Sequence, residues 1–301
     1  MIWPINCVRA TELLANHTSF RIGGPAEWFA TPSDLDELVP LLREAFRRGI
    51  PVSVIGGGTN LLVADQGVQG LVVRLGRGFR TVEMLSSQEA PEAIVRCGAS
   101  VLTQRLVTLA CQQGWGALES LAGLPGQVGG AVVMNAQQIG QFVDRVILVT
   151  LDGQVKELTR DQLSFSYRYT AMEPGIIVQA TFRFPRVPVA TSLARIQQAL
   201  CYRNATQEVS LPSAGCAFKN PQGASAGRLI DQAGLKGVRV GDAKVSLRHA
   251  NFIVNLGQAT CDDVLSLMEY VQRHVARSFG VWLEPEVRVL GARWVAEALS
   301  R

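Results

Sequence analysis

The sequence predicts a protein of class α+β, built from three successive blocks of mixed helices and strands. The first observation behind this prediction is a set of amphipathic segments that begin at capping residues and end at glycine, which is typical of helices. The second is a set of short apolar runs such as "GIIVQATFRF", which favour strands. The third is size, because 301 residues with 48% hydrophobic and 18% charged side chains can form more than one core.

The first block predicts one helix between strands. Ser33 begins an amphipathic segment, and Asp36 three residues later would complete a capping box. After this helix, "PVSVI" predicts a strand, "GGGTN" a tight loop and "LVVRL" another strand. One face of the helix collects the apolar residues Leu35, Leu38, Leu41, Leu42 and Phe46.

The second block, from about residue 75 to 190, combines strands with one clear helix. "AIVRCG" predicts a strand, Ser100 would cap the helix that follows, and Gly114 would end it. Asp152 and Gly153, between two strand-like runs, predict a hairpin. "RFPRVPVATS" contains two prolines, and we expect it to link this block to the next.

The third block has the clearest helix of the chain. Thr260 and Asp263 predict a capping box, and Gly280 would end the helix that they open. "VWLEPEVRVL" follows and is expected to be extended, with Glu286 and Arg288 on the side opposite to its apolar residues. The apolar face of the helix consists of Val264, Leu267, Met268, Val271 and Val275.

Charge and composition narrow the function classes. A net formal charge of +4 suits an anionic small ligand, and no run of Lys and Arg with interleaved aromatics favours nucleic acid. No apolar stretch approaches the roughly 18 residues of a membrane span, and the first residues lack the pattern of a signal peptide. The six cysteines include no C-x-x-C pair, so we expect neither a metal site nor a disulfide framework. We expect a cytoplasmic protein with no nucleic-acid or membrane partner.

Two glycine-rich loops suggest a bound nucleotide. The glycines of "VSVIGGGTNLLV" would let backbone N–H groups approach a phosphate. This loop lacks the Rossmann fingerprint, because the pattern from Gly56 is G-x-G-x-N and no acidic residue lies between Asp65 and Glu83. The second loop, "LAGLPGQVGGAVVMNAQ", precedes a possible helix start, where free N–H groups would hold a pyrophosphate. An ordinary turn explains the first loop alone equally well, and close helix packing explains the second loop alone better than a nucleotide does. Together, the two loops suggest one dinucleotide between subdomains.

Several spaced motifs resemble one enzyme family. "VIGGGTNLLV", "LAGLPGQVGGAVVMN", "SYRYT", "AGCAFKNP" and "LEPEVRVLG", in this order, closely resemble the UDP-N-acetylenolpyruvoylglucosamine reductase family. "NHTSFRIGGPAEWF", "LIDQAGLKG" and "HANFIVN" are also similar to it, so that the resemblance covers almost the whole chain. The chain length is similar to that of the shorter of the two family types.

The resemblance implies both a fold and a domain order. The fold would be α+β, with a two-subdomain FAD-binding region similar to that of the vanillyl-alcohol-oxidase (PCMH-type) flavoproteins and a C-terminal α+β substrate domain. We expect residues 1–74 to form the first FAD-binding subdomain, with residues 291–301 packing back on it. Residues 75–194 would form the second subdomain and residues 195–290 the substrate domain.

The resemblance also implies an NADPH-dependent flavoprotein of peptidoglycan precursor synthesis. NADPH would reduce a non-covalently bound FAD, and hydride from the flavin N5 would reduce the enolpyruvyl group of UDP-N-acetylglucosamine enolpyruvate to UDP-N-acetylmuramate. The expected partners are this UDP-sugar and NADPH, and the enzyme is expected to be a monomer.

The family's functional residues carry over to positions in three groups. Arg168 would bind the substrate carboxylate, Glu286 would stabilise the enol-like intermediate, and Cys216 would donate the proton where the family usually has serine. The residues that would contact FAD are Gly56, Gly57, Gly58, Thr59, Asn60, Leu61, Gly123, Pro125, Gly126, Gly129, Gly130 and Ala131. The residues that would contact the rest of the substrate are Tyr167, Lys219, Asn220, Lys236 and His249.

Each catalytic residue also has a simpler interpretation. Cys216 could be a small buried filler, and Ser213 is a rival proton donor. Arg168 could be an exposed charge on a strand, and Glu286 could pair with Arg288 on a solvated face. At the level of function, the alternatives are a flavin oxidase on a related scaffold and a nucleotide-binding regulator without catalysis. The family register of the motifs favours the reductase.

Overall fold

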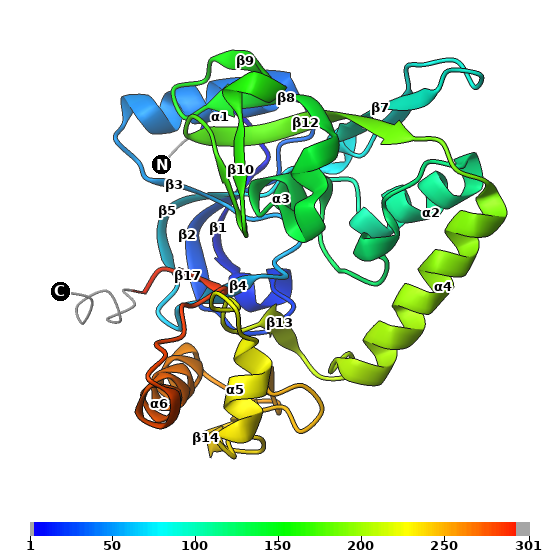
Figure 1. The fold of residues 1–301 in the computed structure, drawn as a ribbon. Helices are drawn as coiled ribbons and strands as arrows, with labels where there is room; N and C mark the ends of the chain where they lie inside the picture. Colours follow the sequence, from blue (N-terminus) through cyan, green and yellow to red (C-terminus); the bar gives the residue numbers. More distant parts are fainter. Residues whose placement is uncertain (1–2, 293–301) are drawn as a thin grey trace. The chain divides into compact units, whose positions relative to one another are not determined.

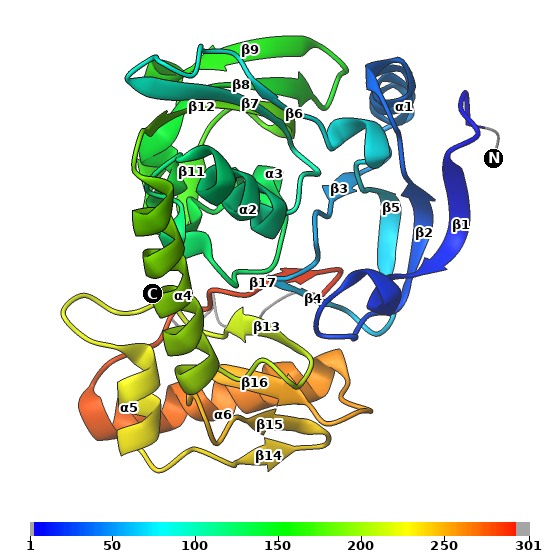
Figure 2. The same cartoon turned by 90° about the vertical axis from the view of Figure 1, so that its right-hand side faces the viewer.

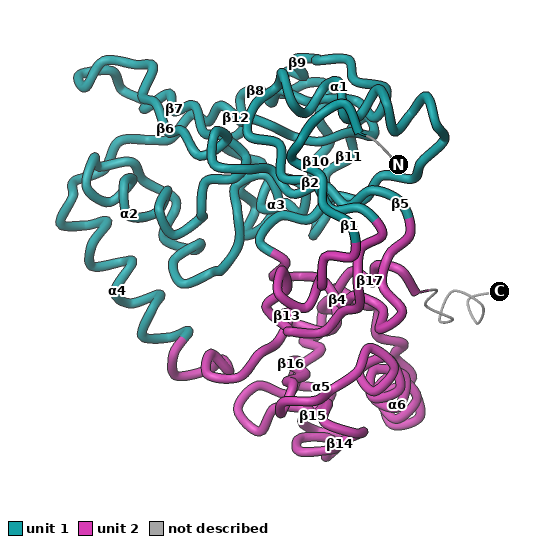
Figure 3. Tube along the Cα trace, turned by 180° about the vertical axis from the view of Figure 1, so that it is seen from behind, with its two compact units in different colours: residues 1–10, 28–57, 70–203 teal, residues 11–27, 58–69, 204–301 magenta. Residues whose placement is uncertain are grey.

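A computed structural model describes residues 3–292 of the chain, and Figure 1 shows its ribbon. The predicted packing of residues 291–301 against the first subdomain therefore falls almost entirely outside the described residues. The chain divides into two compact units. Unit 1 comprises residues 1–10, 28–57 and 70–203, and unit 2 comprises residues 11–27, 58–69 and 204–301 (Figure 3). The three predicted domain boundaries stay a prediction.

A four-stranded sheet contains the strands of the first block, in the order β1-β2-β5-β3. These strands are β1 (Val8–Leu13), β2 (Pro25–Ala30), β5 (Val68–Val73) and β3 (Val52–Val54). Strands β3 and β5 are parallel, and helix α1 (Leu35–Arg47) precedes β3. The predicted strand–loop–strand order around the first glycine loop is thereby confirmed.

Helix α1 differs from its prediction at both the cap and the apolar face. Asp34, not Ser33, is the N-cap, and its side chain accepts the Glu37 N–H at 2.9 Å. The predicted face also extends too far, because Phe46 is 66% exposed while Ala45 is fully buried. The middle of the face is confirmed, since Leu38, Leu41 and Leu42 are all fully buried.

An antiparallel five-stranded sheet forms the centre of unit 1, in the order β6-β7-β12-β8-β9. Its strands are β6 (Val82–Met84), β7 (Glu92–Gly98), β12 (Gly175–Pro185), β8 (Val143–Thr150) and β9 (Val155–Thr159). Figure 2 shows α2 (Thr103–Gln113) and α3 (Val128–Val133) together on one side of this sheet. The predicted hairpin at Asp152 and Gly153 is confirmed between β8 and β9.

Helix α2 begins later than predicted, because Ser100 is not its cap. The fully buried Ser100 hydroxyl donates to the Leu75 carbonyl at 2.9 Å, and Leu102 precedes the helix without a side-chain cap. Gly114 ends α2 in the left-handed conformation, as predicted. Helix α4 (Val189–Thr206) begins within the predicted link, directly after its second proline.

Unit 2 contains an antiparallel sheet in the order β13-β16-β15-β14. These strands are β13 (Ser213–Cys216), β16 (Phe252–Asn255), β15 (Ala243–Val245) and β14 (Arg239–Val240). Helices α5 (Ala226–Gln232) and α6 (Cys261–Phe279) lie beside it. A separate parallel pair joins β17 (Arg288–Leu290) to β4 (Leu61–Val63).

Helix α6 confirms its prediction in full. Thr260 and Asp263 form the capping box, and Gly280 ends the helix in the left-handed conformation. All five predicted face residues are buried in the core of unit 2.

The short 3₁₀ turns are η1 (Leu14–His17), η2 (Arg77–Phe79), η3 (Glu119–Leu121), η4 (Ala136–Phe142) and η5 (Arg160–Gln162). Between residues 3 and 292, no helix is both long and apolar enough to cross a membrane.

Candidate active site

The two glycine loops meet within unit 1. The first loop leaves β3 where the Ile55 N–H donates to the Val73 carbonyl at 2.9 Å. A Cβ atom added to Gly56 would lie 3.4 Å from Oε1 of Gln127, which belongs to the second loop. The Gln127 side chain of the second loop therefore lies against the backbone of the first loop at this point.

The second loop is attached to the core on one side and open on the other. The Val128 N–H donates to the Val101 carbonyl at 2.8 Å, and the Gly129 N–H donates to the Ala99 carbonyl at 2.9 Å. A Cβ atom on Gly129 would lie only 2.9 Å from that of Ala99, so this position requires glycine for packing. The neighbouring Gly130 is exposed, and a Cβ atom there would meet nothing within 4 Å. Helix α3 starts at Val128 and so includes both glycines, earlier than the predicted start.

The latter half of the first loop belongs to unit 2 and has no spare room. Gly58 has φ +65°, and a Cβ atom there would lie 2.0 Å from the His17 carbonyl oxygen. The Gly58 carbonyl accepts the N–H of Ser19 at 3.0 Å. Glycine is therefore required at this position by both its conformation and its neighbours.

These loops fit a flavin dinucleotide on structural grounds. Gly130 presents backbone that no neighbouring side chain covers, which is what a pyrophosphate or ribityl chain needs in order to approach N–H groups. At Gly56 the nearest group to an added Cβ atom is the Gln127 side chain at 3.4 Å. No group of three or more His, Cys, Asp or Glu side chains within residues 3–292 could hold a metal ion.

Arg168 lies in a hairpin turn that helix α3 supports. Strands β10 (Ser164–Ser166) and β11 (Tyr169–Ala171) are joined by Tyr167 and Arg168, and Arg168 has φ +58°. Positive φ is uncommon outside glycine and costs free energy, and such residues cluster at functional sites. Arg168 is half-buried in this turn rather than exposed on a strand, and its guanidinium carbon lies 5.8 Å from the Tyr167 ring centre.

Two hydrogen bonds tie this hairpin to the second glycine loop. The Asn135 side-chain amide donates to the Ser166 carbonyl at 2.8 Å, and the buried Thr170 hydroxyl donates to the Val132 carbonyl at 2.6 Å. Since Val132 lies in α3 and Asn135 follows it, the segment that carries Gly129 and Gly130 also positions Arg168.

Cys216 ends a strand that contains a bulge. In the β13–β16 ladder, Ser213 is opposite Val254 and Cys216 is opposite Phe252, so β13 has one extra residue between these pairs. Gly215 has φ +77° within the bulge. A bulge of this kind bends a strand and re-aims its side chains. The side chain of Cys216 is therefore directed by Gly215 rather than by the regular pleat.

Glu286 lies on the segment next to the thiol. The Glu286 N–H donates to the Ala217 carbonyl at 2.8 Å, and Phe218 forms an isolated bridge with Pro285. The Glu286 carbonyl in turn accepts the side-chain amide of Asn60 at 3.1 Å. Unit 2 thus brings together Cys216, Glu286 and the end of the first glycine loop.

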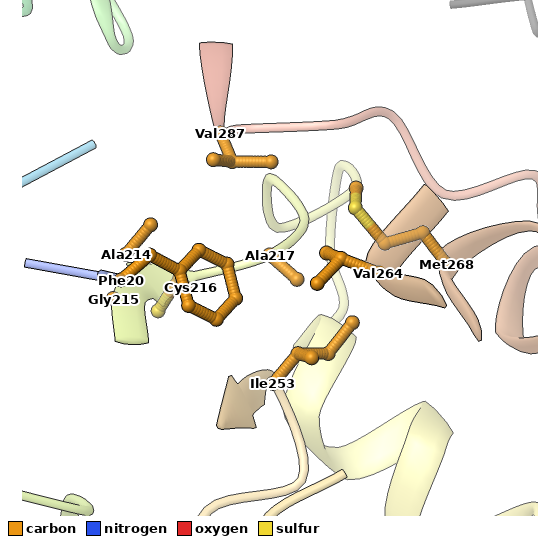
Figure 4. Close-up of a pocket in the computed structure, with 9 residues that line it drawn as sticks. All are labelled: Phe20, Ala214, Gly215, Cys216, Ala217, Ile253, Val264, Met268 and Val287. Carbon is orange, nitrogen blue, oxygen red and sulfur yellow. The ribbon is translucent and has the colours of Figure 1, made fainter. Parts of the chain in front are cut away.

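The wall beside Cys216 is apolar. Figure 4 shows a small cavity that Cys216 lines together with the ring of Phe20. Its volume of about 10 Å³ leaves room for one water molecule at most. Cys216 itself is only half-buried, so these aliphatic and aromatic groups do not cover the residue completely. The remaining lining residues are Ala214, Gly215, Ala217, Ile253, Val264, Met268 and Val287.

The predicted substrate contacts in unit 2 already have protein partners. Lys219 pairs with Glu284 at 3.2 Å, and Lys236 pairs with Asp231 at 2.8 Å. The Asn220 side-chain oxygen accepts the N–H of the first residue of α5 at 3.0 Å. Both lysine pairs are partly exposed, so a diphosphate could displace the carboxylates at little cost.

His249 is held as a neutral imidazole. Burial, followed by the charge of Lys236, lowers the pKa of His249. Its Nδ1 accepts the Asn251 N–H at 3.2 Å, which assigns the proton to Nε2. The ring lies 4.8 Å from that of Phe252, the residue opposite Cys216. His249 can therefore offer a hydrogen-bond donor without a positive charge.

Within its own unit, each half of the predicted site is assembled. Arg168 and the second glycine loop share unit 1, whereas Cys216, Glu286, Lys219 and His249 share unit 2. Three residues that support these groups were not among the predicted site residues: Asn135, Ser19 and Asn251. All three lie inside the family-like motifs, but nothing in their spacing distinguishes a supporting amide or hydroxyl from a surface one.

Comparisons with known proteins show which family this chain resembles. Residues 207–290 match the family model described as UDP-N-acetylenolpyruvoylglucosamine reductase, C-terminal domain, and residues 26–159 match the FAD binding domain. Proteins named UDP-N-acetylenolpyruvoylglucosamine reductase from Geobacter metallireducens and Pelobacter propionicus are each 44% identical to this chain. These matches cover 93% and 94% of this chain and 93% and 95% of the relatives.

A solved structure is also similar over nearly its full length. The crystal structure of UDP-N-acetylenolpyruvylglucosamine reductase (MurB) from Thermus caldophilus has a TM-score of 0.79 and 38% sequence identity. The match covers 94% of this chain and 99% of that one. Together with the FAD binding domain match, this confirms the predicted α+β fold, with an FAD-binding region followed by a C-terminal domain.

Proposed function

This chain belongs to the family of UDP-N-acetylenolpyruvoylglucosamine reductases, and from that membership we propose that it reduces UDP-N-acetylglucosamine enolpyruvate to UDP-N-acetylmuramate. It is an FAD-dependent oxidoreductase of peptidoglycan precursor synthesis that uses NADPH. The observation that carries the proposal is the direct backbone contact between the segments of Cys216 and Glu286. We expect the enzyme to act as a monomer in the cytoplasm, with FAD-binding subdomains at residues 1–74 and 75–194 and a substrate domain at residues 195–290.

The two glycine loops hold the cofactor. Residues 56–61 and 123–131 would contact the FAD pyrophosphate and ribityl chain, where glycine leaves the backbone open, as at Gly130. When bound and reduced by NADPH, FAD supplies the hydride for the enolpyruvyl double bond.

Arg168 binds the substrate carboxylate. Its planar guanidinium can hold both carboxylate oxygens at once, which fixes the orientation of the enolpyruvyl group. The turn that holds Arg168 at positive φ reduces its freedom before substrate arrives, so less conformational entropy is lost on binding. The neighbouring Tyr167 is 56% exposed and available to the substrate.

Cys216 donates the proton, and Glu286, in its protonated form, donates a hydrogen bond to the enol-like intermediate that forms before the proton transfer. Hydride addition to one alkene carbon leaves negative charge spread toward the substrate carboxylate, and the S–H of Cys216 protonates the other carbon. A thiol has an ordinary pKa of about 8.5, so it is mostly protonated at neutral pH and gives up its proton more readily than a serine hydroxyl. The resulting thiolate recovers a proton from solvent, which its partial exposure allows.

The remaining polar residues of unit 2 bind the UDP-sugar. Lys219 and Lys236 exchange their carboxylate partners for diphosphate oxygens, and neutral His249 donates from Nε2. Asn220 binds substrate through its amide nitrogen, because its oxygen is already occupied by α5.

The two half-reactions test this proposal separately. In anaerobic stopped-flow experiments, NADPH should bleach the flavin rapidly and the enolpyruvyl substrate should restore its colour. Cys216→Ala should leave flavin reduction near the parental rate and slow reoxidation by substrate about 10²–10⁴-fold. Cys216→Ser should keep much of the activity, whereas Arg168→Ala should weaken substrate binding with the flavin still bound.

Three outcomes would contradict the proposal. If Cys216→Ala turns over like the parent, Cys216 is not the proton donor. Rapid reoxidation of the reduced flavin in air, with no response to substrate, would indicate an oxidase. Purified protein that stays colourless after FAD is added would indicate a regulator without catalysis.

A further inference from the structure

The segment that carries the thiol lies between two parts of unit 2. The Ala217 N–H donates to the Asn251 carbonyl at 2.8 Å, while the Ala217 carbonyl accepts the Glu286 N–H at the same distance. Residues 217–219 thus form the middle of three hydrogen-bonded segments. A displacement of this middle segment moves Cys216 relative to Glu286.

The side chain of Asn251 pairs with both polar backbone groups of one residue in this segment. Its Oδ1 accepts the Phe218 N–H at 3.0 Å, and its Nδ2 donates to the Phe218 carbonyl at 2.8 Å. Asn251 is 2% exposed and Phe218 is 1% exposed, so water has little access to replace these bonds. The amide therefore acts as an additional peptide group, at the point where β13 has left its regular register with β16.

From this geometry we propose that Asn251 is a positioning residue for the protonation step. It sets the distance and direction of the Cys216 thiol relative to the segment of Glu286. This inference rests on the proposed function. A proton donor must be held within a fraction of an ångström of its acceptor, and a displacement of about 1 Å can slow a reaction about 100-fold.

The chain offers a matched control in Asn255, the last residue of β16, whereas Asn251 directly precedes that strand. Asn255 is also 2% exposed, and its side chain makes three hydrogen bonds, one more than that of Asn251. Its Oδ1 accepts the N–H groups of Gly257 and Ala259, and its Nδ2 donates to the Phe20 carbonyl. These bonds support the fold of unit 2 without touching residues 216–219 or 284–286.

The test compares half-reactions of the FAD-loaded enzyme. Asn251→Ala should keep flavin reduction by NADPH within about twofold of the parent and slow reoxidation by the enolpyruvyl substrate about 10–100-fold. Asn255→Ala should lose thermal stability without this selective slowing. In a Cys216→Ala background, Asn251→Ala should slow reoxidation by no more than about twofold further, because a residue that acts through the thiol has nothing left to position.

Several results would overturn the inference. One is a parental reoxidation rate in Asn251→Ala, another is equal slowing in Asn251→Ala and Asn255→Ala, and a third is full additivity with Cys216→Ala. If Asn251→Ala does not fold, Asn251→Asp serves instead, since it keeps the acceptor for the Phe218 N–H and removes the donor to the Phe218 carbonyl. A parent that reduces no enolpyruvyl substrate would instead contradict the proposed function itself.

Discussion

Gly129 and Gly130 are adjacent in α3, yet replacement by alanine should change apo-protein stability in opposite directions. At Gly130 the added methyl group meets nothing within 4 Å, and the backbone is helical. Alanine is favoured over glycine in a helix by up to about 1 kcal/mol, so Gly130→Ala should stabilise the apo protein by about 0.5–1 kcal/mol. In a protein of 301 residues this corresponds to about 1–2 °C in melting temperature.

At Gly129 the same methyl group would lie 2.9 Å from the Ala99 Cβ and 3.3 Å from the Ala99 carbonyl oxygen. These neighbours are in the core of unit 1, because Ala99 is 3% exposed. Overpacking of this kind costs about 1–3 kcal/mol, which exceeds the helix gain. Gly129→Ala should therefore destabilise the apo protein.

Although Gly130→Ala should stabilise the apo protein, it should weaken the binding of FAD. If FAD approaches the backbone at Gly130, the methyl group of alanine occupies that space, and FAD affinity should fall about tenfold or more, equivalent to about 1.4 kcal/mol. Thermal melts of deflavinated protein and FAD titrations followed by flavin fluorescence measure the two effects separately. Unchanged FAD affinity in a stabilised Gly130→Ala protein would refute the placement of the cofactor at this loop.

Three further predictions concern other parts of the chain. Gly58→Ala should prevent stable folding, because its methyl group would lie 2.0 Å from the His17 carbonyl oxygen at φ +65°, and circular dichroism of the purified protein would show whether it does. Burial lowers the pKa of His249, so its contribution to stability is present above the ordinary value of 6.5 and is lost as pH falls below that value. In thermal melts from pH 8 to 5, the melting temperature should therefore fall more steeply in the parent than in His249→Asn. Burial raises the pKa of Cys261 to about 12, so iodoacetamide at pH 8 should label exposed Cys201 in the folded protein and Cys261 only after unfolding, as peptide mass mapping would report.

The sequence predicts those elements whose signals are local. Helix α6 was placed correctly at both ends because Thr260, Asp263 and Gly280 act on backbone groups within their own turns. The start of α2 was predicted wrongly, because the Ser100 hydroxyl donates to the Leu75 carbonyl and does not cap the helix. Leu75 lies 25 residues away in sequence, so no local pattern predicts this bond. At α1, two adjacent residues could each cap the helix, and the structure uses Asp34.

Local sequence patterns predict even less of the geometry of the candidate site. The motifs identify Arg168, Cys216 and Glu286 as residues of interest, but the positive φ of Arg168 and the bulge before Cys216 depend on partners elsewhere in the chain. A bulge exists only relative to the opposite strand, and β16 is separated from β13 by two further strands and a helix in sequence. The supporting amide of Asn251 is likewise defined only by the segment on which it packs.

Helix α3 is hydrogen-bonded to the Arg168 hairpin, so substitutions that displace α3 should also displace Arg168. The Val132 carbonyl accepts the Thr170 hydroxyl, and Asn135 donates to Ser166, so a shift of α3 moves the hairpin as well. Gly129→Ala, which forces α3 away from Ala99, should therefore raise the KM for the enolpyruvyl substrate in addition to weakening FAD binding. Gly130→Ala leaves α3 in place and should weaken FAD binding alone. A difference in KM between these neighbouring variants, measured at saturating FAD, would support the proposal that α3 both contacts FAD and positions Arg168 for the substrate carboxylate.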